Sequence, residues 1–565
     1  MTEKLSVCFI WHMHQPLYKD RQSGLYLMPW VRLHAIKDYL DMPLVLEDYP
    51  KIRQTFNLVP SLLEQLNDYA HGAVDEQILL MSKDESHYTP AEKITILSES
   101  FHCNVDRQIR KHEPYFQLWL KRDALLKRGY TIAAMIDQFS EQEYADMMTW
   151  MNLAWFDPYW LTRNAEVAGF IRQAGNFNLE QRLRLIEIER ELIRQTIPVY
   201  KRLQDSGQIE VTTTPYYHPI LPLLIDTNAA KIPTPETALP KRLYFHREDA
   251  RVQLEKGLLL YEEMLGRKAR GMWPSEMAVS PAALELIAET GINWVVLDEA
   301  LLTKTTGVNI YRDEHGNLNN AEVLCQPYKL IVGDEEINIL FREVVTSNEI
   351  GFSYGGRNPQ EAASALYMRL KHIQQKLFHW EREGVVAIAL DGENCWETYE
   401  EDGQPFLNEL YERISQDTTL RVCTVSEYLE NNATTAELRN IHSGSWISAD
   451  YHIWIGDEHK NLAWDHLGAA RDFLVKKLKS ENHSAEVAKR AWEEIYAAEG
   501  SDWFWWFGEP NNSAHDDMFD EQFRLRLQNV YKLLGEAYPD ALNKSIYAQI
   551  AESKPKPILS APQRT

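Results

Sequence analysis

The chain has 565 residues, with 59 Lys and Arg against 83 Asp and Glu, which gives a formal net charge of −24. This acidic balance argues against a nucleic-acid partner, because such proteins carry basic patches. The composition, 44% hydrophobic and 25% charged, is that of a globular protein with two to four domains or one large barrel with additions. No apolar run approaches the length of a membrane span.

The cysteines and the N-terminus predict a cytoplasmic protein. The five cysteines Cys8, Cys103, Cys325, Cys395 and Cys423 are widely scattered, and an odd, scattered set indicates reduced thiols rather than a disulfide framework. The opening "MTEKLSVCFIW" has no basic region followed by an apolar core, so we expect no signal peptide.

Short runs rich in β-branched residues, each ending in polar residues, alternate with helical patterns along most of the chain. The stretch "SPAALELIAETG", for example, has a proline in its first turn and a glycine at its end, as helices do. This alternation predicts a parallel α/β fold, and seven or eight strands favour a barrel over an open sheet. The expected strands are 6–14, 54–59, 209–215, 269–276, 292–299, 337–344, 385–393 and 419–425.

Two stretches depart from this rhythm. Residues from about 60 to 205 look almost wholly helical and are too long for a simple crossover, so we expect a helical insertion in a barrel domain of residues 1–430. From about 431 the strand patterns stop, which predicts a C-terminal helical domain over 431–550. The tail 551–565 has the composition of a disordered segment.

The first expected strand, "VCFIWHMHQP", ends in paired histidines. By alternation Cys8, Ile10, His12 and His14 share one face of the strand. Ligands of parallel α/β folds bind at the carboxyl ends of strands. The sequence therefore predicts a site here.

Two other expected strands end in carboxylates. Glu276 closes "GMWPSE", three residues after Trp273, and Asp391 closes the small-residue strand in "VVAIALDGENCWETY". Each has a plainer alternative, a helix N-terminal Glu favoured by the dipole or a helix-capping Asp. Two carboxylates that converge across a barrel mouth suit glycoside hydrolysis, and Glu393 would supply the like charge that raises a pKa.

Aromatic residues are abundant, with 17 tryptophans and 27 tyrosines. One explanation is a large aromatic core, and the other is sugar recognition through stacking on aromatic faces. In "IEVTTTPYYHP" Glu210 lies on the expected strand, and His218 lies on the proline-stiffened aromatic loop that follows it and would suit a sugar subsite. The run "DWFWWF" after Gly500 and Ser501 cannot turn every ring toward the core from one helix, so some rings are expected to face a ligand.

These motifs together resemble those of glycoside hydrolase family 57, which includes α-amylases, amylopullulanases, 4-α-glucanotransferases and glycogen branching enzymes. The resemblance covers nearly the whole chain through five motif regions: "HMHQP", "GQIEVT", "GMWPSE", "ALDGEN" and "AEGSDWFWW". It is strongest to the α-amylase and amylopullulanase-like members. One departure is Asn348 in "TSNEIGF", where many members have an acidic residue.

The resemblance implies a (β/α)7-type distorted barrel and a retaining mechanism on α-glucans, cutting α-1,4 and in some members α-1,6 bonds. Glu276 would be the nucleophile and Asp391 the general acid/base, with carboxyl groups about 5–5.5 Å apart. It implies no metal and no cofactor. The expected substrate-binding residues are His12, His14, Gln15, Glu210, His218, Trp273, Glu393, Trp396, Asp502 and Trp505.

Three alternatives stay open at this point. The same carboxylates would serve a glucanotransferase or branching enzyme, and a catalytically silent glucan-binding protein belongs to a different class. A zinc-dependent carbohydrate enzyme built on His12 and His14 is the third, because a His-x-His pair on one strand face is a common zinc ligand pair. The oligomeric state is not indicated by the sequence.

Overall fold

The computed structural model describes residues 5–511, 513 and 515–553, and its centre is a ring of seven strands. The ring follows the order β1-β2-β3-β4-β5-β7-β8 and returns to β1, with all its pairings parallel, and a single bridge from Thr213 to Met272 joins β3 to β4. The predicted parallel α/β barrel is confirmed. The ring strands are β1 (Leu5–Met13), β2 (Gln54–Leu58), β3 (Ile209–Thr212), β4 (Gly271–Met272), β5 (Trp294–Asp298), β7 (Glu335–Arg342) and β8 (Gly384–Asp391).

The register of these strands collects polar side chains at the carboxyl end of the barrel. His12 on β1 is paired with Asn57 on β2 and with Asp391 on β8. Asn57 is paired in turn with Thr212, the last residue of β3. Polar groups from four neighbouring strands therefore meet at one level, where ligands of such barrels bind.

Three strands lie outside the ring. β9 (Leu420–Val422) pairs with the start of β1, β6 (Tyr328–Val332) runs antiparallel to β7, and β10 (Ala436–Leu438) pairs with β6. The expectation that strands stop at about 431 is wrong at β10, and β6 was not predicted. Both strands extend the sheet beyond the ring, and β10 has only three residues. Neither segment has the continuous apolar pattern that predicts a barrel strand.

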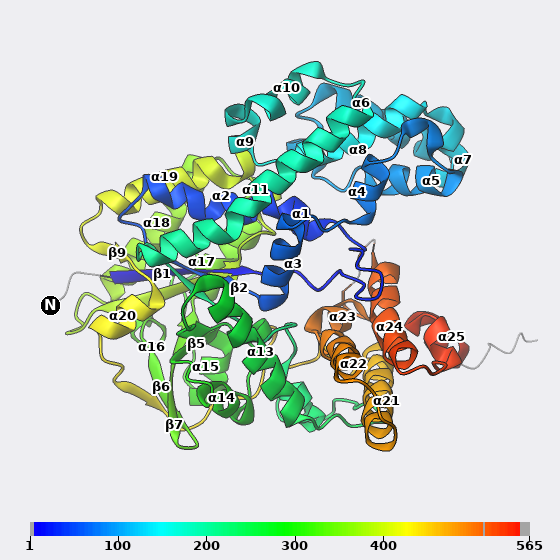
Figure 1. The fold of residues 1–565 in the computed structure, drawn as a ribbon. Helices are drawn as coiled ribbons and strands as arrows, with labels where there is room; N and C mark the ends of the chain where they lie inside the picture. Colours follow the sequence, from blue (N-terminus) through cyan, green and yellow to red (C-terminus); the bar gives the residue numbers. More distant parts are fainter. Residues whose placement is uncertain (1–4, 512, 514, 554–565) are drawn as a thin grey trace, which may run out of the picture.

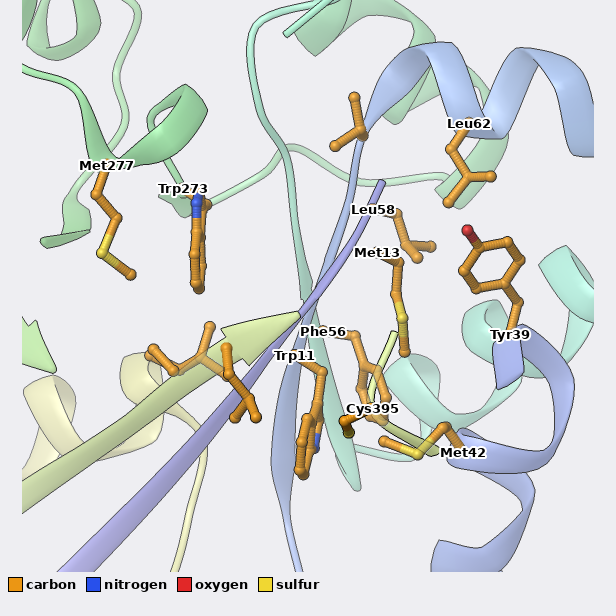
Figure 2. Close-up of a cluster of buried hydrophobic side chains, with 14 of the residues drawn as sticks. Trp11, Met13, Tyr39, Met42, Phe56, Leu58, Leu62, Trp273, Met277 and Cys395 are labelled. Carbon is orange, nitrogen blue, oxygen red and sulfur yellow. The ribbon is translucent and has the colours of Figure 1, made fainter. Parts of the chain in front are cut away.

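Helices cover the outer face of the barrel and bury the other side of β1. Figure 2 shows Trp11, Met13 and Phe56 gathered toward Tyr39 and Met42 of α2 (Asp38–Leu44), all buried. The remaining helices around the barrel are α1 (Trp30–Ala35), α3 (Pro60–Ala70), α12 (Leu221–Ile225), α13 (Arg247–Leu265), α14 (Pro281–Ala288), α15 (Glu299–Thr306), α16 (Ala321–Leu324), α17 (Val344–Asn348), α18 (Pro359–Lys376), α19 (Gln404–Gln416) and α20 (Val425–Asn431).

Between β2 and β3 the chain is helical from Pro60 to Asp205, the region expected as an insertion. The helices after α3 form a lobe at the top right of Figure 1, and the long α11 (Leu179–Asp205) runs from this lobe back to the barrel. The helices of the lobe are α4 (Glu76–Met81), α5 (Pro90–Glu99), α6 (Glu113–Lys127), α7 (Ile132–Met135), α8 (Glu141–Trp155), α9 (Pro158–Arg163) and α10 (Ala165–Gln173).

A second helical group, coloured orange to red in Figure 1, packs beside the barrel. It consists of α21 (Glu458–Ser480), α22 (Ala485–Ala498), α23 (Ser501–Trp506), α24 (Asp516–Leu533) and α25 (Ile546–Ser553). The tail expected over 551–565 lies outside the described residues except for 551–553, which belong to α25. Among the described helices, none has both the length and the apolar character needed to cross a membrane.

The closure of the barrel depends on a glycine in β4. A Cβ atom added to Gly271 would lie 2.0 Å from the Trp294 indole, so we expect Gly271→Ala to lower the free energy of unfolding by about 1–3 kcal/mol through overpacking. Urea denaturation followed by fluorescence measures this change. Gly169→Ala is the matched control, because its Cβ would meet only Arg172, at 3.9 Å, and alanine suits a helix interior. Equal stability of the two variants would contradict this account.

Candidate active site

His12 is fixed as a neutral imidazole at the floor of the barrel mouth. Its Nδ1 lies 2.6 Å from Asn57 Oδ1, while the Asn57 amide NH₂ donates to the carbonyl of Thr213, so Nδ1 carries the proton. Burial and the neighbouring His14 lower the pKa of His12 to about 3. Because the proton is on Nδ1, Nε2 is an acceptor. The ring stacks on the Trp273 indole at a centroid distance of 4.7 Å.

His14 and His218 form a second imidazole stack, 4.0 Å between ring centroids. His14 Nε2 lies 2.8 Å from Asp502 Oδ1 on α23, and the His14 backbone N–H donates to Glu393. His218 has a left-handed backbone with φ of 57°. Burial and the two neighbouring histidines lower the pKa of His218, so it is neutral.

Glu276 sits on a strained turn directly after β4. Its backbone is left-handed, with φ of 57° and ψ of 24°, and Met277 follows with φ of 48°. Such conformations cost free energy in residues other than glycine and cluster at functional sites. The turn aims the carboxylate at Trp446, whose indole N–H donates to Oε2 at 2.8 Å, and at Ser501, whose hydroxyl lies 3.4 Å from Oε1.

A hydrogen-bonded chain connects this carboxylate to the imidazole stack. His218 Nδ1 lies 2.8 Å from Ser501 Oγ, and the Ser501 backbone N–H donates to the His218 carbonyl. When the Ser501 hydroxyl donates to Glu276, His218 Nδ1–H must donate to Ser501. The C-terminal helix α23 thus supplies one link in the chain of contacts around Glu276.

The Glu276 carboxyl group holds its proton unusually tightly. Its pKa rises from the ordinary 4.5 to about 8, because of burial first and then the negative charges of Asp502 and Asp391. The two donors, Trp446 and Ser501, oppose this rise. The group therefore titrates near neutral pH, as groups tuned for acid–base or nucleophilic chemistry do.

Asp391 ends β8 and faces the same mouth. Burial raises its pKa, while an amide contact from Asn394 at 3.4 Å and the charges of His14 and Arg342 oppose the rise. Glu393 lies deeper, and burial followed by the charge of Asp391 raises its pKa too. Asp391 thus acts on Glu393, whereas the sequence suggested that Glu393 would act on Asp391.

A cavity of about 960 Å³ opens from Asp391 toward solvent. Trp446 and Trp505 contribute indole rings to its wall, and Asn348 lies beside Arg342 on the same wall. Within α23, Trp503 and Phe504 are buried in the core while Trp505 is only partly buried. The aromatic run of this helix is therefore divided between core and cavity.

Three buried polar atoms beside this cluster have no hydrogen-bond partner: His14 Nδ1, His218 Nε2 and Trp273 Nε1. Buried polar atoms are usually paired, so an orphaned group at a site calls for a ligand or water. One indole N–H donor and two imidazole nitrogens on flat rings suit a polyhydroxylated molecule. His14, His218 and Asp502 also present ligand atoms within 4.8 Å of one another, so these three residues, rather than His12, could hold a metal ion.

The structure does not bring every expected residue to the mouth. Trp396 packs in the core against Trp11, its indole N–H donating to the Gly392 carbonyl. Glu210 is paired with Thr55, below the level of His12, and accepts hydrogen bonds from Ser426 and Trp294.

Gln15 is buried, and its side-chain oxygen Oε1 accepts a hydrogen bond from the Tyr18 hydroxyl.

The remaining expected residues gather around Glu276 and Asp391. Sequence reasoning missed Asn57, Arg342, Trp446 and Ser501. Ser501 lies inside the motif "AEGSDWFWW" next to Asp502, whereas Trp446 lies outside the five family motifs.

The buried Glu276 should lower the stability of the protein as pH rises. Because its folded pKa of about 8 exceeds its unfolded value, the stability contributed by its proton is full below about pH 4.5 and lost as pH rises through 8. Glu276→Gln is therefore expected to leave Tm unchanged at pH 4 and to raise it by at least about 2 °C at pH 9.

Differential scanning calorimetry across this pH range checks the effect. The control is Glu262→Gln, at an exposed position of α13, for which no such pH-dependent difference is expected. If the Tm of Glu276→Gln equalled that of the parent protein at every pH, the surroundings would not raise the pKa of this carboxyl group.

Comparison with solved structures supports the architecture. A branching enzyme of family 57 from Thermococcus kodakaraensis superimposes with a TM-score of 0.59 at 15% identity, over 94% of this chain and 90% of that one. An α-amylase from Thermotoga maritima superimposes with a TM-score of 0.56 at 13% identity, over 96% of both chains. At such identities the likeness shows the fold alone.

Sequence relatives are distant. A 4-α-glucanotransferase of Thermococcus kodakarensis is 24% identical over 246 residues, which span 44% of this chain and 31% of that enzyme. A 1,4-α-glucan branching enzyme of the same organism is 21% identical over 366 residues, spanning 54% of this chain and 50% of the relative. The protein-family model of glycosyl hydrolase family 57 matches residues 8–441, which include Glu276 and Asp391. The chain therefore belongs to glycosyl hydrolase family 57.

Proposed function

We propose that this protein is a retaining glycoside hydrolase that acts on α-glucans, with Glu276 as nucleophile and Asp391 as general acid/base. The observation that carries the proposal is the pairing of these two carboxyl groups at the barrel mouth. The charge of Asp391 raises the pKa of Glu276, so the two carboxyl groups are near enough for one to act on the other. Two coupled carboxyl groups beside an aromatic cavity are what glycoside hydrolysis requires.

In the first step the Glu276 carboxylate attacks the anomeric carbon while Asp391 gives its proton to the departing glycosidic oxygen. A covalent glycosyl-enzyme results. In the second step Asp391 takes a proton from water, whose oxygen attacks the same carbon and releases Glu276. The expected carboxyl separation of about 5–5.5 Å in a ligand-bound structure stays a prediction.

Individual contacts of each group suit its role, although burial and like charges hold the pKa of Glu276 at about 8. Trp446 and Ser501 donate to the Glu276 oxygens, which favours the ionised form that a nucleophile needs. Asp391 has only the 3.4 Å contact from Asn394 and lines the open cavity, where a departing sugar would lie. The orphaned ring nitrogens of His14, His218 and Trp273 would bond hydroxyl groups of the attacked sugar.

The substrate class rests on the relatives. The names of sequence relatives include α-amylases, a 4-α-glucanotransferase and a branching enzyme, and α-glucans are common to all three. Hydrolysis of the amylase or amylopullulanase type is our first choice. Transfer to a sugar hydroxyl is the second candidate, because the same carboxylates serve it and one of these relatives is a transferase by name.

Product analysis with soluble starch, pullulan and maltoheptaose separates these activities. We expect new reducing ends from the parent protein and a loss of at least about 10³-fold in kcat for Glu276→Gln and Asp391→Asn, since each removes a group that the reaction requires. Trp396→Phe is the matched control, because Trp396 lies in the core, and it should keep most of the activity.

Longer oligosaccharides without new reducing ends would indicate a transferase. Equal inertness of the parent protein and both carboxylate variants on all three substrates would contradict an enzyme of this class and favour a glucan-binding protein.

The pH profile of kcat/KM distinguishes the two carboxylate roles. A nucleophile must be ionised, so the rising acid limb reports the pKa of Glu276 in the free enzyme. Asp502→Asn removes a negative charge that raises this pKa and should move the acid limb to lower pH. Trp446→Phe removes a donor that lowers it and should move the limb to higher pH.

Opposite shifts from these two variants, each of about half a unit or more, are the expected result. If Glu276 were instead the general acid, the same substitutions would move the falling alkaline limb. Profiles in which neither limb moves would show that the ionisation of Glu276 does not control the reaction.

A further inference from the structure

We propose that Glu99, His102 and His515 form a zinc site that joins the helical lobe to the C-terminal helices. Glu99 is the last residue of α5 and His102 follows it by three residues, whereas His515 directly precedes α24. The site lies outside the barrel mouth and takes no part in the proposed reaction.

The three side chains already converge. One ligand atom from each lies within 4.8 Å of the other two. His102 Nδ1 is 3.0 Å from Glu99 Oε2, and the rings of His102 and His515 meet edge to face at a centroid distance of 4.7 Å. Side chains more than 400 positions apart in sequence thus point at one location.

An ordinary ion pair does not account for this arrangement. Although Glu99 approaches His102 Nδ1, that nitrogen is buried and makes no hydrogen bond, so the carboxylate oxygen is off the N–H direction. A cation between the His102 ring and the Glu99 carboxylate would bind the lone pair of His102 Nδ1 and a lone pair of Glu99 Oε2 at the same time. Two imidazoles and one carboxylate are a common zinc ligand set, with water completing a tetrahedron.

The surroundings hold the ligands in place and leave a path for an ion. The Trp155 indole N–H donates to the His102 carbonyl, and the Trp30 ring lies 5.9 Å from His515 and 6.3 Å from His102. A cavity of about 280 Å³ adjoins the site, lined by Trp30, Glu99 and Met518 among others. Glu99 therefore has room to turn toward a metal ion.

Such an ion would stabilise only the folded arrangement, because the ligands come from the lobe and from the C-terminal helices. Zinc binding should then raise Tm with zinc concentration. The experiment uses the full chain, stripped with chelator and titrated with zinc chloride alone. Calorimetry gives the affinity and stoichiometry, and thermal unfolding gives Tm.

His515→Gln, His102→Gln and Glu99→Gln are each expected to weaken zinc binding at least about tenfold and to abolish the rise in Tm. His87→Gln is the matched control, a histidine of the same lobe whose side chain is 73% exposed, and it should bind zinc like the parent protein. Three separate ligand variants keep the test valid if one of them fails to fold.

The competing outcome is binding at the barrel mouth, where His14, His218 and Asp502 also converge. If Asp502→Asn abolished zinc binding while Glu99→Gln, His102→Gln and His515→Gln retained it, the proposal would be overturned. It would equally be overturned if the parent protein bound no zinc or bound it without a rise in Tm. Visible absorption of a four-coordinate cobalt complex, lost in His515→Gln, would support it independently.

Discussion

The constraint on which the rest of this structure depends is the burial of the Glu276 carboxyl group beside two other carboxyl groups. Burial and like charges both disfavour ionisation, and together they raise the pKa of this group to about 8. Two donors, Trp446 and Ser501, oppose the effect. The turn that presents Glu276 is itself strained at φ of 57°, so the fold must hold the group in a state that the isolated turn would not adopt.

That stabilisation comes from segments remote in sequence. The Trp446 backbone N–H donates to the Glu276 carbonyl while its indole holds the carboxylate, and Gly444 bridges to Val279 just beyond the turn. Gly500 bridges to Pro219, which places Ser501 against His218. The barrel therefore supplies Glu276 and Asp391, whereas the C-terminal part supplies Asp502 and much of the environment of the other two. A family match that ends at residue 441 leaves out Trp446, Ser501 and Asp502.

The sequence predicts best what local periodicity controls. Alternation correctly placed His12 and Asp391 at strand ends, because one strand register fixes which face each residue takes. The motif that contains Trp396 also contains Asp391, yet Trp396 lies in the core, since it belongs to the short 3-10 helix Trp396–Thr398 after β8, where strand alternation no longer applies. Glu210 lies two residues before Thr212, which places it below the mouth, and a motif match carries no information about depth. Trp446 and Asn57 stayed hidden because their contacts depend on tertiary docking and not on a local pattern.

Two of the three imidazoles, those of His12 and His218, leave the negative charge of the site uncompensated. His12 and His218 are buried, and burial lowers the pKa of each, so neither provides a positive charge that would bring the pKa of Glu276 down. A cationic histidine in van der Waals contact would make Glu276 fully ionised, but it would also neutralise the field that the carboxylates exert on a developing positive charge at a sugar ring. Neutral rings instead contribute hydrogen-bonding atoms and flat surfaces without altering the local charge. On the proposed mechanism, this division leaves binding of the sugar to the histidines and stabilisation of the transition state to the carboxylates.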